Sequence, residues 1–363
     1  MELARLGDLV KIKTWKLDAN AKVEWWKYPF FTCAREISWI DKPTYDCECV
    51  LVAGNGDLNV KYYHGKFDAY QRTYIIECNS TSELSMKYLY YFMQSYLEKL
   101  RSQTIGWVIQ YIKMNNLTDI LIPLPSLAKQ KIIVTKLDKL IDLIDLKKEA
   151  IWKTEELTKS VFSKIFLTGN LPEKSLSELV ERIQIWPFGT QLHFSDYIEN
   201  WIPLINPTNI KNGIIIPDFS NTITFEKAQS LSEYFLKEGD VIMWRRWEMW
   251  RCALVKIVEQ GWFCWTGSLY LRPGKRISWL YLSNLLQTDK YKKILENESR
   301  GATMPNLNKG IISKLPIPIP PIEDTEKYYK ITNYYAEVIE NQNQSLQKLQ
   351  ELYNTTTQEL FSF

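Results

Sequence analysis

Ile122-Pro-Leu-Pro125 and Ile317-Pro-Ile-Pro320 are two copies of one short motif, and their spacing decides how the chain is organised. A long helical pattern follows each copy. Upstream of the motif, the same offset places Ile112 on Leu307 without any gap. Internal repetition of this kind is sought first because it determines the architecture. A period of about 195 residues is far too long for a solenoid repeat, so each copy predicts a whole domain.

Each motif introduces a segment with the apolar spacing of a coiled coil, alternating between three and four residues. The first, from Leu127 to about Phe166, has this seam: Ile133, Leu137, Leu140, Ile144, Ile151, Val161 and Ile165. Pro125 before the segment and Gly169 after it are start and stop signals. The second runs over about 322–361, with this seam: Ile331, Tyr335, Val338, Leu349 and Leu352. We expect the two helices to pair antiparallel; the alternative is that each packs on its own globular unit.

The globular part of the first repeat predicts a hairpin and a helix. Residues 49–56 indicate a buried strand that enters a glycine turn, and Val60-Lys-Tyr-Tyr63 indicates the returning strand. A nucleotide-binding loop would need a helical pattern directly after the turn, and none follows. Residues 84–101 have an i, i+3, i+4 apolar stripe that predicts a helix. In the second repeat, residues 240–243 match the first strand and 280–295 match the helix.

Composition narrows the possible functions. Six cysteines without CxxC spacing and only two histidines leave little material for a zinc site or a His-based triad, so free thiols are expected. Residues 1–15 mix charged with apolar residues and contain no signal-peptide core, and no apolar run approaches a membrane span. We therefore expect a cytoplasmic protein without a membrane segment. The net charge of +3 permits DNA binding but does not show it.

The ordered set of motifs resembles the DNA-specificity subunits of type I restriction–modification systems. The duplicated proline motif with its helix carries the resemblance, together with three segments of the second repeat: Ile205-Asn-Pro-Thr-Asn-Ile210, Gly239-Asp-Val-Ile-Met243 and Thr303-Met-Pro-Asn-Leu307. The resemblance covers essentially the whole chain. It implies an α+β fold of two similar target-recognition domains, joined by two long helices in an antiparallel coiled coil with a pseudo-two-fold internal repeat. The implied domains are 1–125 and 171–320 for target recognition, with conserved helices over 126–170 and 321–363.

The resemblance also implies a function. The chain would be a non-catalytic, sequence-specific subunit that recognises a bipartite site on double-stranded DNA. Its partners would be two methyltransferase (modification) subunits and a restriction/translocase subunit, and it would need no cofactor and no metal. A different class of function is a coiled-coil scaffold that joins two protein-binding domains without DNA.

A stand-alone methyltransferase is a further alternative. Asn206-Pro-Thr-Asn209 is close to the Asn-Pro-Pro-aromatic motif of amino-methyltransferases, but it lacks the second proline and the aromatic residue that would hold a flipped base. No glycine loop for a cofactor accompanies it. The residues favour a turn stabilised by Asn and Pro.

The candidate DNA-binding residues are polar or basic and lie on the predicted hairpins and on the loops before the proline motifs, where Arg can grip guanine or clamp phosphate. In the first repeat they are Lys61, Tyr62, Tyr63, Gln71, Arg72, Arg101, Gln110 and Lys113. In the second repeat they are Arg245, Arg246, Arg251, Arg300, Thr303, Asn306 and Lys309.

Several tryptophans stand where the family usually has small residues, mostly glycine: Trp244, Trp247, Trp250 and Trp265, with Trp15, Trp26, Trp107, Trp186 and Trp201 looking similar. The internal repeat aligns Trp247 with Gly56 at the hairpin turn, where a positive φ would favour glycine. One explanation is that aromatic residues gather on DNA-facing loops. The other is that a UGA codon meaning glycine in the source has been read as tryptophan.

Overall fold

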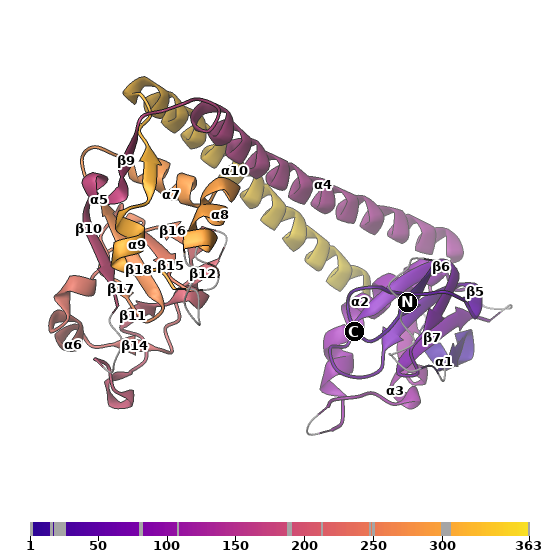
Figure 1. Ribbon diagram of the computed structural model, residues 1–363. Coiled ribbons are helices and arrows are strands. Elements are labelled where there is room, and N and C mark those ends of the chain that lie inside the picture. The colour runs from indigo at the N-terminus through magenta and orange to yellow at the C-terminus, as the bar shows by residue number, and fades with distance from the viewer. Residues whose placement is uncertain are drawn as a thin grey trace. The chain divides into compact units, whose positions relative to one another are not determined.

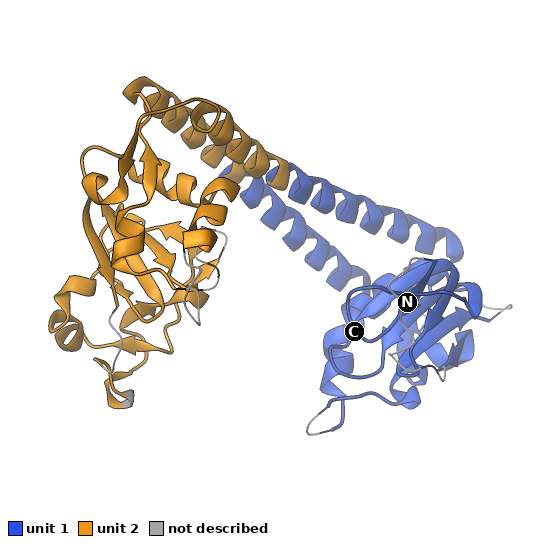
Figure 2. Cartoon of the chain, in the orientation of Figure 1, with its two compact units in different colours: residues 1–151, 340–363 blue, residues 152–339 orange. Residues whose placement is uncertain are grey.

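The computed structural model describes residues 3–14, 17, 27–79, 83–106, 109–186, 191–211, 213–246, 248, 251–298 and 306–361. The chain forms two compact units (Figure 2): unit 1 consists of residues 1–151 with 340–363, and unit 2 consists of residues 152–339. Two long helices, α4 (Leu127–Phe166) and α10 (Ile322–Phe361), each contribute one part to each unit. The predicted positions and equal lengths of these helices are confirmed.

Unit 1 is built on a mixed six-stranded sheet in the order β2-β7-β5-β6-β3-β4 (Figure 1). The strands are β2 (Val10–Lys13), β3 (Tyr28–Phe31), β4 (Ser38–Ile40), β5 (Tyr45–Ala53), β6 (Val60–Ala69) and β7 (Thr73–Cys78). Alternate residues of β5 enter different hydrophobic clusters, with Val50 and Val52 on one face and Cys49 and Leu51 on the other. This explains the continuous apolar run, because the central strand is buried on both faces. Apart from β3 and β6, which run parallel, the neighbouring strands are antiparallel.

Helix α2 (Met86–Ser102) covers one face of this sheet, as the apolar stripe predicts. Its N-cap is Ser85, whose hydroxyl accepts a hydrogen bond from the Tyr88 amide. The remaining elements are short: β1 (Leu3–Arg5), α1 (Leu6–Leu9), α3 (Met114–Thr118) and β8 (Leu121–Pro123). Strand β8 includes the first two residues of the first proline motif, Ile122 and Pro123, and pairs antiparallel with β1.

Unit 2 repeats this plan with a four-stranded antiparallel sheet in the order β10-β18-β15-β16. The strands are β10 (Val180–Ile185), β15 (Val241–Trp244), β16 (Cys252–Leu254) and β18 (Ser268–Pro273). Strand β19 (Pro316–Pro318) includes the first two residues of the second proline motif and pairs with β9 (Glu173–Ser175), as β8 pairs with β1. A second sheet has the order β14 (Thr222–Ile223), β11 (Ile202–Ile205) and β17 (Phe263–Cys264). A third sheet pairs β12 (Ile210–Lys211) with β13 (Ile214–Ile215). The other α-helices are α5 (Leu176–Leu179), α6 (Phe225–Gln229), α7 (Trp279–Leu286), α8 (Asp289–Glu298) and α9 (Lys309–Ser313).

The helix expected over 280–295 is divided into α7 and α8, which is a correction to the sequence prediction. The break lies at Thr288. Its hydroxyl donates to the Leu285 carbonyl at 2.7 Å and accepts from the Tyr291 amide at 3.4 Å. A threonine whose hydroxyl bonds to the backbone of both neighbouring turns can end one helix and begin the next. The spacing of apolar residues carries no information on such hydrogen bonds.

The long helices run antiparallel within each unit, as predicted. In unit 1, residues near the start of α4, such as Leu137, share a hydrophobic cluster with Phe361 near the end of α10. In unit 2, the rings of Phe162 and Phe166 near the end of α4 lie 5.3 and 5.2 Å from Tyr328 near the start of α10. The assignment of Leu352 to the buried seam is wrong, because this residue is 50% exposed.

The proline motif of each repeat is attached to its globular part by the same hydrogen bond. The Tyr88 hydroxyl donates to the Pro123 carbonyl at 2.8 Å, and the Tyr281 hydroxyl donates to the Pro318 carbonyl at 2.9 Å. Both tyrosines are buried and lie on the first helix that packs on the sheet, α2 in unit 1 and α7 in unit 2. The repeat in the sequence is therefore a repeat of specific contacts as well as of elements.

Candidate nucleic-acid interface

In unit 1, three chain segments meet at the turn between β5 and β6. The Gly54 amide donates to the Arg72 carbonyl at 2.7 Å, and the Ile112 amide donates to the Gly54 carbonyl at 3.0 Å. The Gly56 amide donates to the Gln110 carbonyl at 2.9 Å, and Gly56 has a φ of +66°, which favours glycine. These bonds fix the hairpin turn, the β6–β7 turn and the loop before α3 as one surface, which we call the unit 1 interface.

Charged side chains gather around this turn. The Asp57 carboxylate lies 3.1 Å from Nη2 of Arg35 and 3.6 Å from Nη2 of Arg101. The hydrogen bond from Arg35 and the nearby positive charges hold the pKa of Asp57 below its usual range. Arg101 also donates to the Leu58 carbonyl, and Lys61 donates to the Ala34 carbonyl at 2.7 Å. The cations are thus held in place before any ligand arrives.

Six of the eight residues proposed for unit 1 from the sequence lie at or next to this interface. Lys61, Arg72, Arg101 and Gln110 belong to the contacting segments, and Gln71 and Lys113 are their exposed neighbours. Arg35 and Asp57 were missed. Arg35 lies in an irregular segment between two short strands, so nothing in the sequence pattern places it beside the hairpin.

Tyr62 and Tyr63 serve the packing of β6. The Tyr62 hydroxyl donates to Glu48 at 2.8 Å, and burial raises the pKa of this tyrosine to about 12, with the Glu48 contact adding to the effect. The Tyr63 ring lies 5.1 Å from that of Phe31. Whether either also touches DNA stays a prediction.

Unit 2 contains the same arrangement at equivalent positions. The Arg245 amide donates to the Gly267 carbonyl at 3.1 Å, and the Leu307 amide donates to the Arg245 carbonyl at 2.7 Å. These two bonds correspond to those of Gly54 in unit 1. Gly267 and Leu307 stand at the repeat offset of 195 residues from Arg72 and Ile112, whereas Arg245 follows Gly54 by 191 residues. Arg245, at the end of β15, thus lies against Leu307, just before α9. The described residues around this contact are called the unit 2 interface.

The side chains of the unit 2 interface differ in their accessibility. Arg245 is only 4% exposed, and this burial, helped by the neighbouring Arg246, lowers its pKa. Arg246 is half-buried and forms a backbone bridge with Asn306. Arg251 forms an ion pair with Glu248, and its guanidinium lies 5.0 Å from the centre of the Trp244 ring.

The other candidates of the second repeat are at the loop before α9. Lys309 is exposed at the start of that helix. Arg300 and Thr303 lie outside the described residues.

The tryptophans at glycine-like positions fall into different environments. Trp186 is 2% exposed and packs 4.6 Å from the Tyr234 ring, whereas Trp201 is 54% exposed. Trp244 contacts Arg251, and Trp265 is half-buried beside Tyr197. The remaining five lie outside the described residues: Trp15, Trp26, Trp107, Trp247 and Trp250. The alternatives given for these positions therefore stay open.

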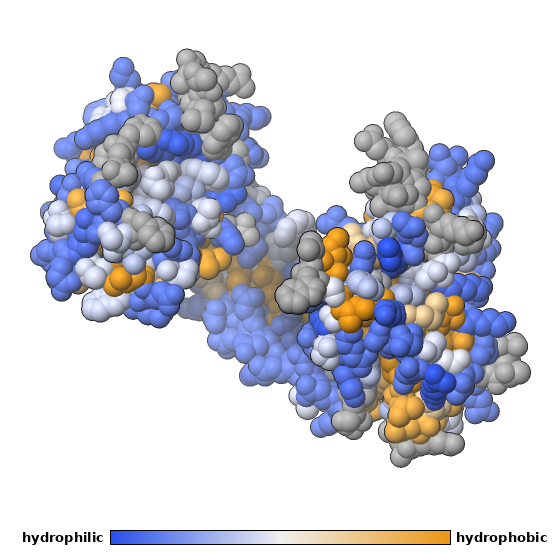
Figure 3. Space-filling model, turned by 90° about the horizontal axis from the view of Figure 1, so that it is seen from below, coloured by the Kyte–Doolittle hydropathy of each residue, from blue (hydrophilic) through white to orange (hydrophobic). Residues whose placement is uncertain are grey.

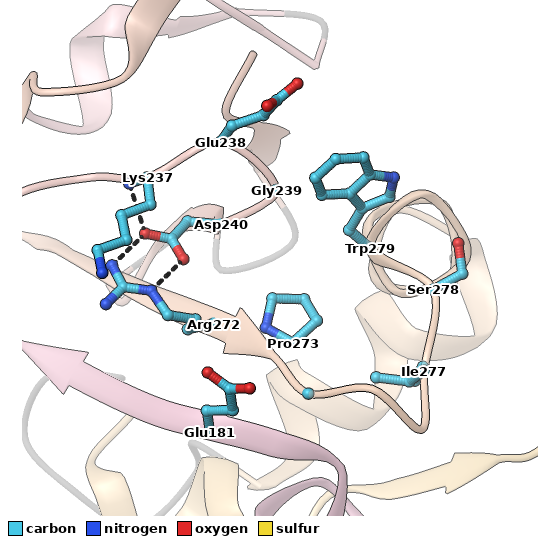
Figure 4. A pocket seen from close by; sticks show the side chains of 11 residues that line it. Glu181, Lys237, Glu238, Gly239, Asp240, Arg272, Pro273, Ile277, Ser278 and Trp279 are labelled. Carbon is cyan, nitrogen blue, oxygen red and sulfur yellow. Dashed lines mark hydrogen bonds and ion pairs between the residues drawn. The ribbon is translucent and has the colours of Figure 1, made fainter. Parts of the chain in front are cut away.

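A pocket of about 470 Å³ lies elsewhere in unit 2, between the ends of β10 and β18 and the start of α7 (Figure 4). The Arg272 guanidinium donates to both oxygens of Asp240, at 2.8 and 2.7 Å, and the Lys237 amide donates to the same carboxylate. Because Asp240 is 1% exposed and its oxygens accept three hydrogen bonds from within unit 2, it serves to hold the fold. Gly239 has a φ of +84°, and a Cβ there would lie 1.7 Å from the Trp279 ring. Both residues of the Gly239-Asp240 pair are therefore required by the fold.

None of the six cysteines, all of which the structure describes, is in a disulfide bond. Among the described residues, no group of three metal-ligating side chains comes together. In the same part of the chain, no helix is long and apolar enough to cross a membrane.

A family model for the type I restriction modification DNA specificity domain matches residues 1–156 and 189–351. The chain belongs to this family. The two matched segments correspond to the two repeats, and the resemblance drawn from the motifs is confirmed. The family is defined by DNA specificity and not by a catalysed reaction, which agrees with the expected non-catalytic role.

Individual members of the specificity family are similar over long stretches. The chain is 28% identical to the type I restriction enzyme EcoDI specificity subunit of Escherichia coli, over 96% of this chain and 84% of that protein. It is 25% identical to the MjaVIII specificity subunit of Methanocaldococcus jannaschii, over 65% of this chain and 60% of that protein.

Two solved structures share the fold of this specificity-family chain. The S subunit from M. genitalium aligns with a TM-score of 0.57 at 17% identity, covering 100% of this chain and 96% of that chain. A chain from a structure of complex assembly and conformational transition of the type I R-M system aligns with a TM-score of 0.59 at 18% identity, covering 99% and 96%. At these identities the likeness establishes the fold, with its two similar globular parts and two long antiparallel helices.

Proposed function

We propose that this chain is the DNA-reading subunit of a type I restriction–modification complex and recognises a bipartite site on double-stranded DNA. One observation supports the proposal: Gly54 in unit 1 and Arg245 in unit 2 each form two equivalent backbone bonds. One bond goes to a residue just before β7 or β18, and the other goes to a residue before the proline motif, Ile112 or Leu307. Two similar surfaces on one chain suit two half-sites on one duplex. The half-sites differ in sequence, because the side chains at the two interfaces differ.

The domain assignment follows from this. We assign target recognition to residues 1–125 and 171–320, and spacing of the two half-sites to the helices within 126–170 and 321–363. Two DNA-binding domains in one chain can bind both half-sites at once only if their separation matches the spacing of the half-sites. The same requirement holds for dimeric DNA-binding proteins.

The exposed cations and amides carry the proposed contacts with DNA. In unit 1 these are Gln71, Arg72, Gln110 and Lys113, with Arg101 and Lys61 held behind them by contacts to Leu58 and Ala34. In unit 2, Arg246, Arg251 and Lys309 are at least partly accessible, whereas Arg245 would have to leave a buried position to reach a ligand. Arg251 is the best placed for base contact, because stacking on Trp244 fixes the plane of its guanidinium.

The partners would be two modification subunits and a restriction subunit, and helix α4 offers a surface for the former. Within unit 1, Ile132, Leu143 and Leu146 lie on one face of α4, distinct from its buried seam, and are 68%, 49% and 61% exposed. Lys136 and Lys139 flank them. We propose that a modification subunit covers this stripe, because exposed apolar side chains at helical spacing are typical of a helix-packing surface.

The test is methylation mapping of the reconstituted complex. Purified chain with its modification subunits should methylate a split sequence, and the purified chain alone should transfer no methyl group from S-adenosylmethionine. Changing Arg72 and Lys113 to alanine should impair one half-site, and changing Arg246 and Arg251 should impair the other. Binding to duplex DNA should weaken steeply with salt. A chain that shows no salt-dependent binding in the complex would instead be a protein scaffold, and methyl transfer by the chain alone would refute the non-catalytic assignment.

A further inference from the structure

The described residues that flank 107–108, before α3 in unit 1, include apolar side chains and are bonded to each other through the backbone. Ile105 and Tyr111 exchange two backbone hydrogen bonds, at 3.0 and 2.9 Å. Gly106 has a φ of +113°, and a Cβ there would lie 2.4 Å from the Ile109 carbonyl oxygen. Ile105 and Tyr111 are therefore held together by their backbones, and Ile109 lies two residues before Tyr111, with its carbonyl oxygen close to Gly106.

This loop is attached to the hairpin turn of the unit 1 interface. Besides the bonds of Gln110 and Ile112 to the turn, Tyr111 forms a backbone bridge with Asn55. The apolar residues of the loop are thus held beside the exposed cations proposed to contact DNA.

The apolar side chains of the loop reach solvent. Ile109 is 60% exposed, Ile105 is 42% exposed and Tyr111 is 37% exposed. Figure 3 shows hydrophobic residues at the surface of the chain, lying among hydrophilic ones. Single exposed apolar residues are common on proteins. Here Ile105, Ile109 and Tyr111 lie within seven residues of one another, and Ile105 and Tyr111 are paired through their backbones. This arrangement suits a ligand that has both charge and apolar groups.

The surrounding charge indicates which ligand this is. The contacting segments, 33–36, 54–61, 70–72, 98–103 and 109–116, contain six cations and three carboxylates. The cations are Arg35, Lys61, Arg72, Lys99, Arg101 and Lys113, and the carboxylates are Glu36, Asp57 and Glu98. An apolar patch with a basic surround complements a polyanion that exposes apolar groups, and the major groove of DNA does so through the 5-methyl group of thymine.

We propose that Ile109, supported by Ile105, contacts a thymine methyl group in the half-site read by unit 1. This inference rests on the proposed DNA-reading function and specifies how one half-site is read. An isoleucine side chain forms no hydrogen bonds with a base. Its contact with the 5-methyl group distinguishes thymine from cytosine, which lacks that group. The contact therefore specifies an A·T pair at that position of the half-site.

The test pairs a change in the protein with a change in the DNA. In the complex with modification subunits, each thymine of the mapped site is replaced in turn by deoxyuridine, which lacks only the methyl group. For the unaltered chain, replacement at one position in one half-site should weaken binding about fourfold, since burying one such group contributes about 0.8 kcal/mol. For Ile109→Ala, binding to the thymine duplex should be weaker, and replacement at that position should have no further effect.

Controls separate this inference from the function on which it rests. Leu121→Ala removes an equally accessible apolar side chain of unit 1, 53% exposed on β8, and should keep the full response to deoxyuridine. The thymine contact would be overturned if the unaltered chain and Ile109→Ala responded equally to deoxyuridine at every thymine. It would also be overturned if the half-site contained no A·T pair. Neither result would contradict DNA recognition by the chain. Loss of the modification subunit from Ile109→Ala on purification would show that the patch is a protein interface. Absence of any sequence-specific binding by the unaltered complex would instead refute the proposed function.

Discussion

Asp57 is the residue on which the arrangement of cations in unit 1 depends. It lies between Arg35 and Arg101, and without it these guanidinium groups would have no common acceptor among the described contacts. A carboxylate in a DNA-binding surface repels phosphate, so its presence reduces affinity. It also orients the arginine planes, which favours selective contacts over general attraction to the backbone.

Asp57→Asn should therefore strengthen binding to non-specific DNA and weaken discrimination between specific and non-specific duplexes. Each additional phosphate contact made by a released arginine should steepen the salt dependence by about 0.9 in the log–log slope. Measuring the dissociation constants of the complex at several salt concentrations checks this. Asp119→Asn is the control, because Asp119 pairs with Arg5 on β1, outside the contacting segments. Unchanged slope and discrimination in Asp57→Asn would show that the carboxylate has no role in DNA binding.

At the scale of elements, the two long helices pair through seams that contain polar residues. Among the described residues, the Oε1 atom of Gln342 in α10 is buried and accepts no hydrogen bond. A buried acceptor without a donor destabilises the folded state. Polar residues at seam positions fix the register of coiled coils at some cost in stability, which offers a reason for a glutamine at this position.

Gln342→Leu should stabilise the chain by about 1–3 kcal/mol, since it replaces an unsatisfied amide with an apolar side chain of similar size. The change is measured as the free energy of unfolding in denaturant. Gln344→Leu is the matched control two residues away, on an exposed position where the amide already bonds to Glu340, and it should bring no gain. A loss of stability in Gln342→Leu would mean that this amide finds a partner in solution.

The sequence predicted the elements better than it predicted their side-chain environments. Apolar spacing and the proline motifs gave the bounds of α4 and α10, because both are set by local preferences that the sequence displays directly. The break at Thr288 was missed, since it depends on a side chain bonding to the backbone on both sides. Likewise, the basic residues of the interfaces were visible in the sequence, but the burial of Arg245 and the pairing of Asp57 with Arg35 follow from contacts far apart along the chain.

At the scale of the whole molecule, the proposed function assigns each half-site to one unit and the spacing between half-sites to the helices. Inserting one heptad into both α4 and α10 keeps the seam in phase and adds about 10 Å of helix. The preferred spacer should then lengthen by about 3 base pairs, with both half-sites unchanged. Methylation mapping of the insertion variant checks this. An unchanged spacer would mean that the helices do not set the distance.

Phe361, near the end of α10, is fully buried in unit 1, with its ring 5.4 Å from that of Tyr88 and 5.8 Å from that of Phe92. A ribosome makes these partners more than 260 residues before it makes Phe361. During translation the first unit must therefore wait, with part of its apolar core uncovered, while the whole of the second unit is synthesised. For the same reason, a premature stop codon shortly before Phe361 would damage the unit encoded at the opposite end of the gene.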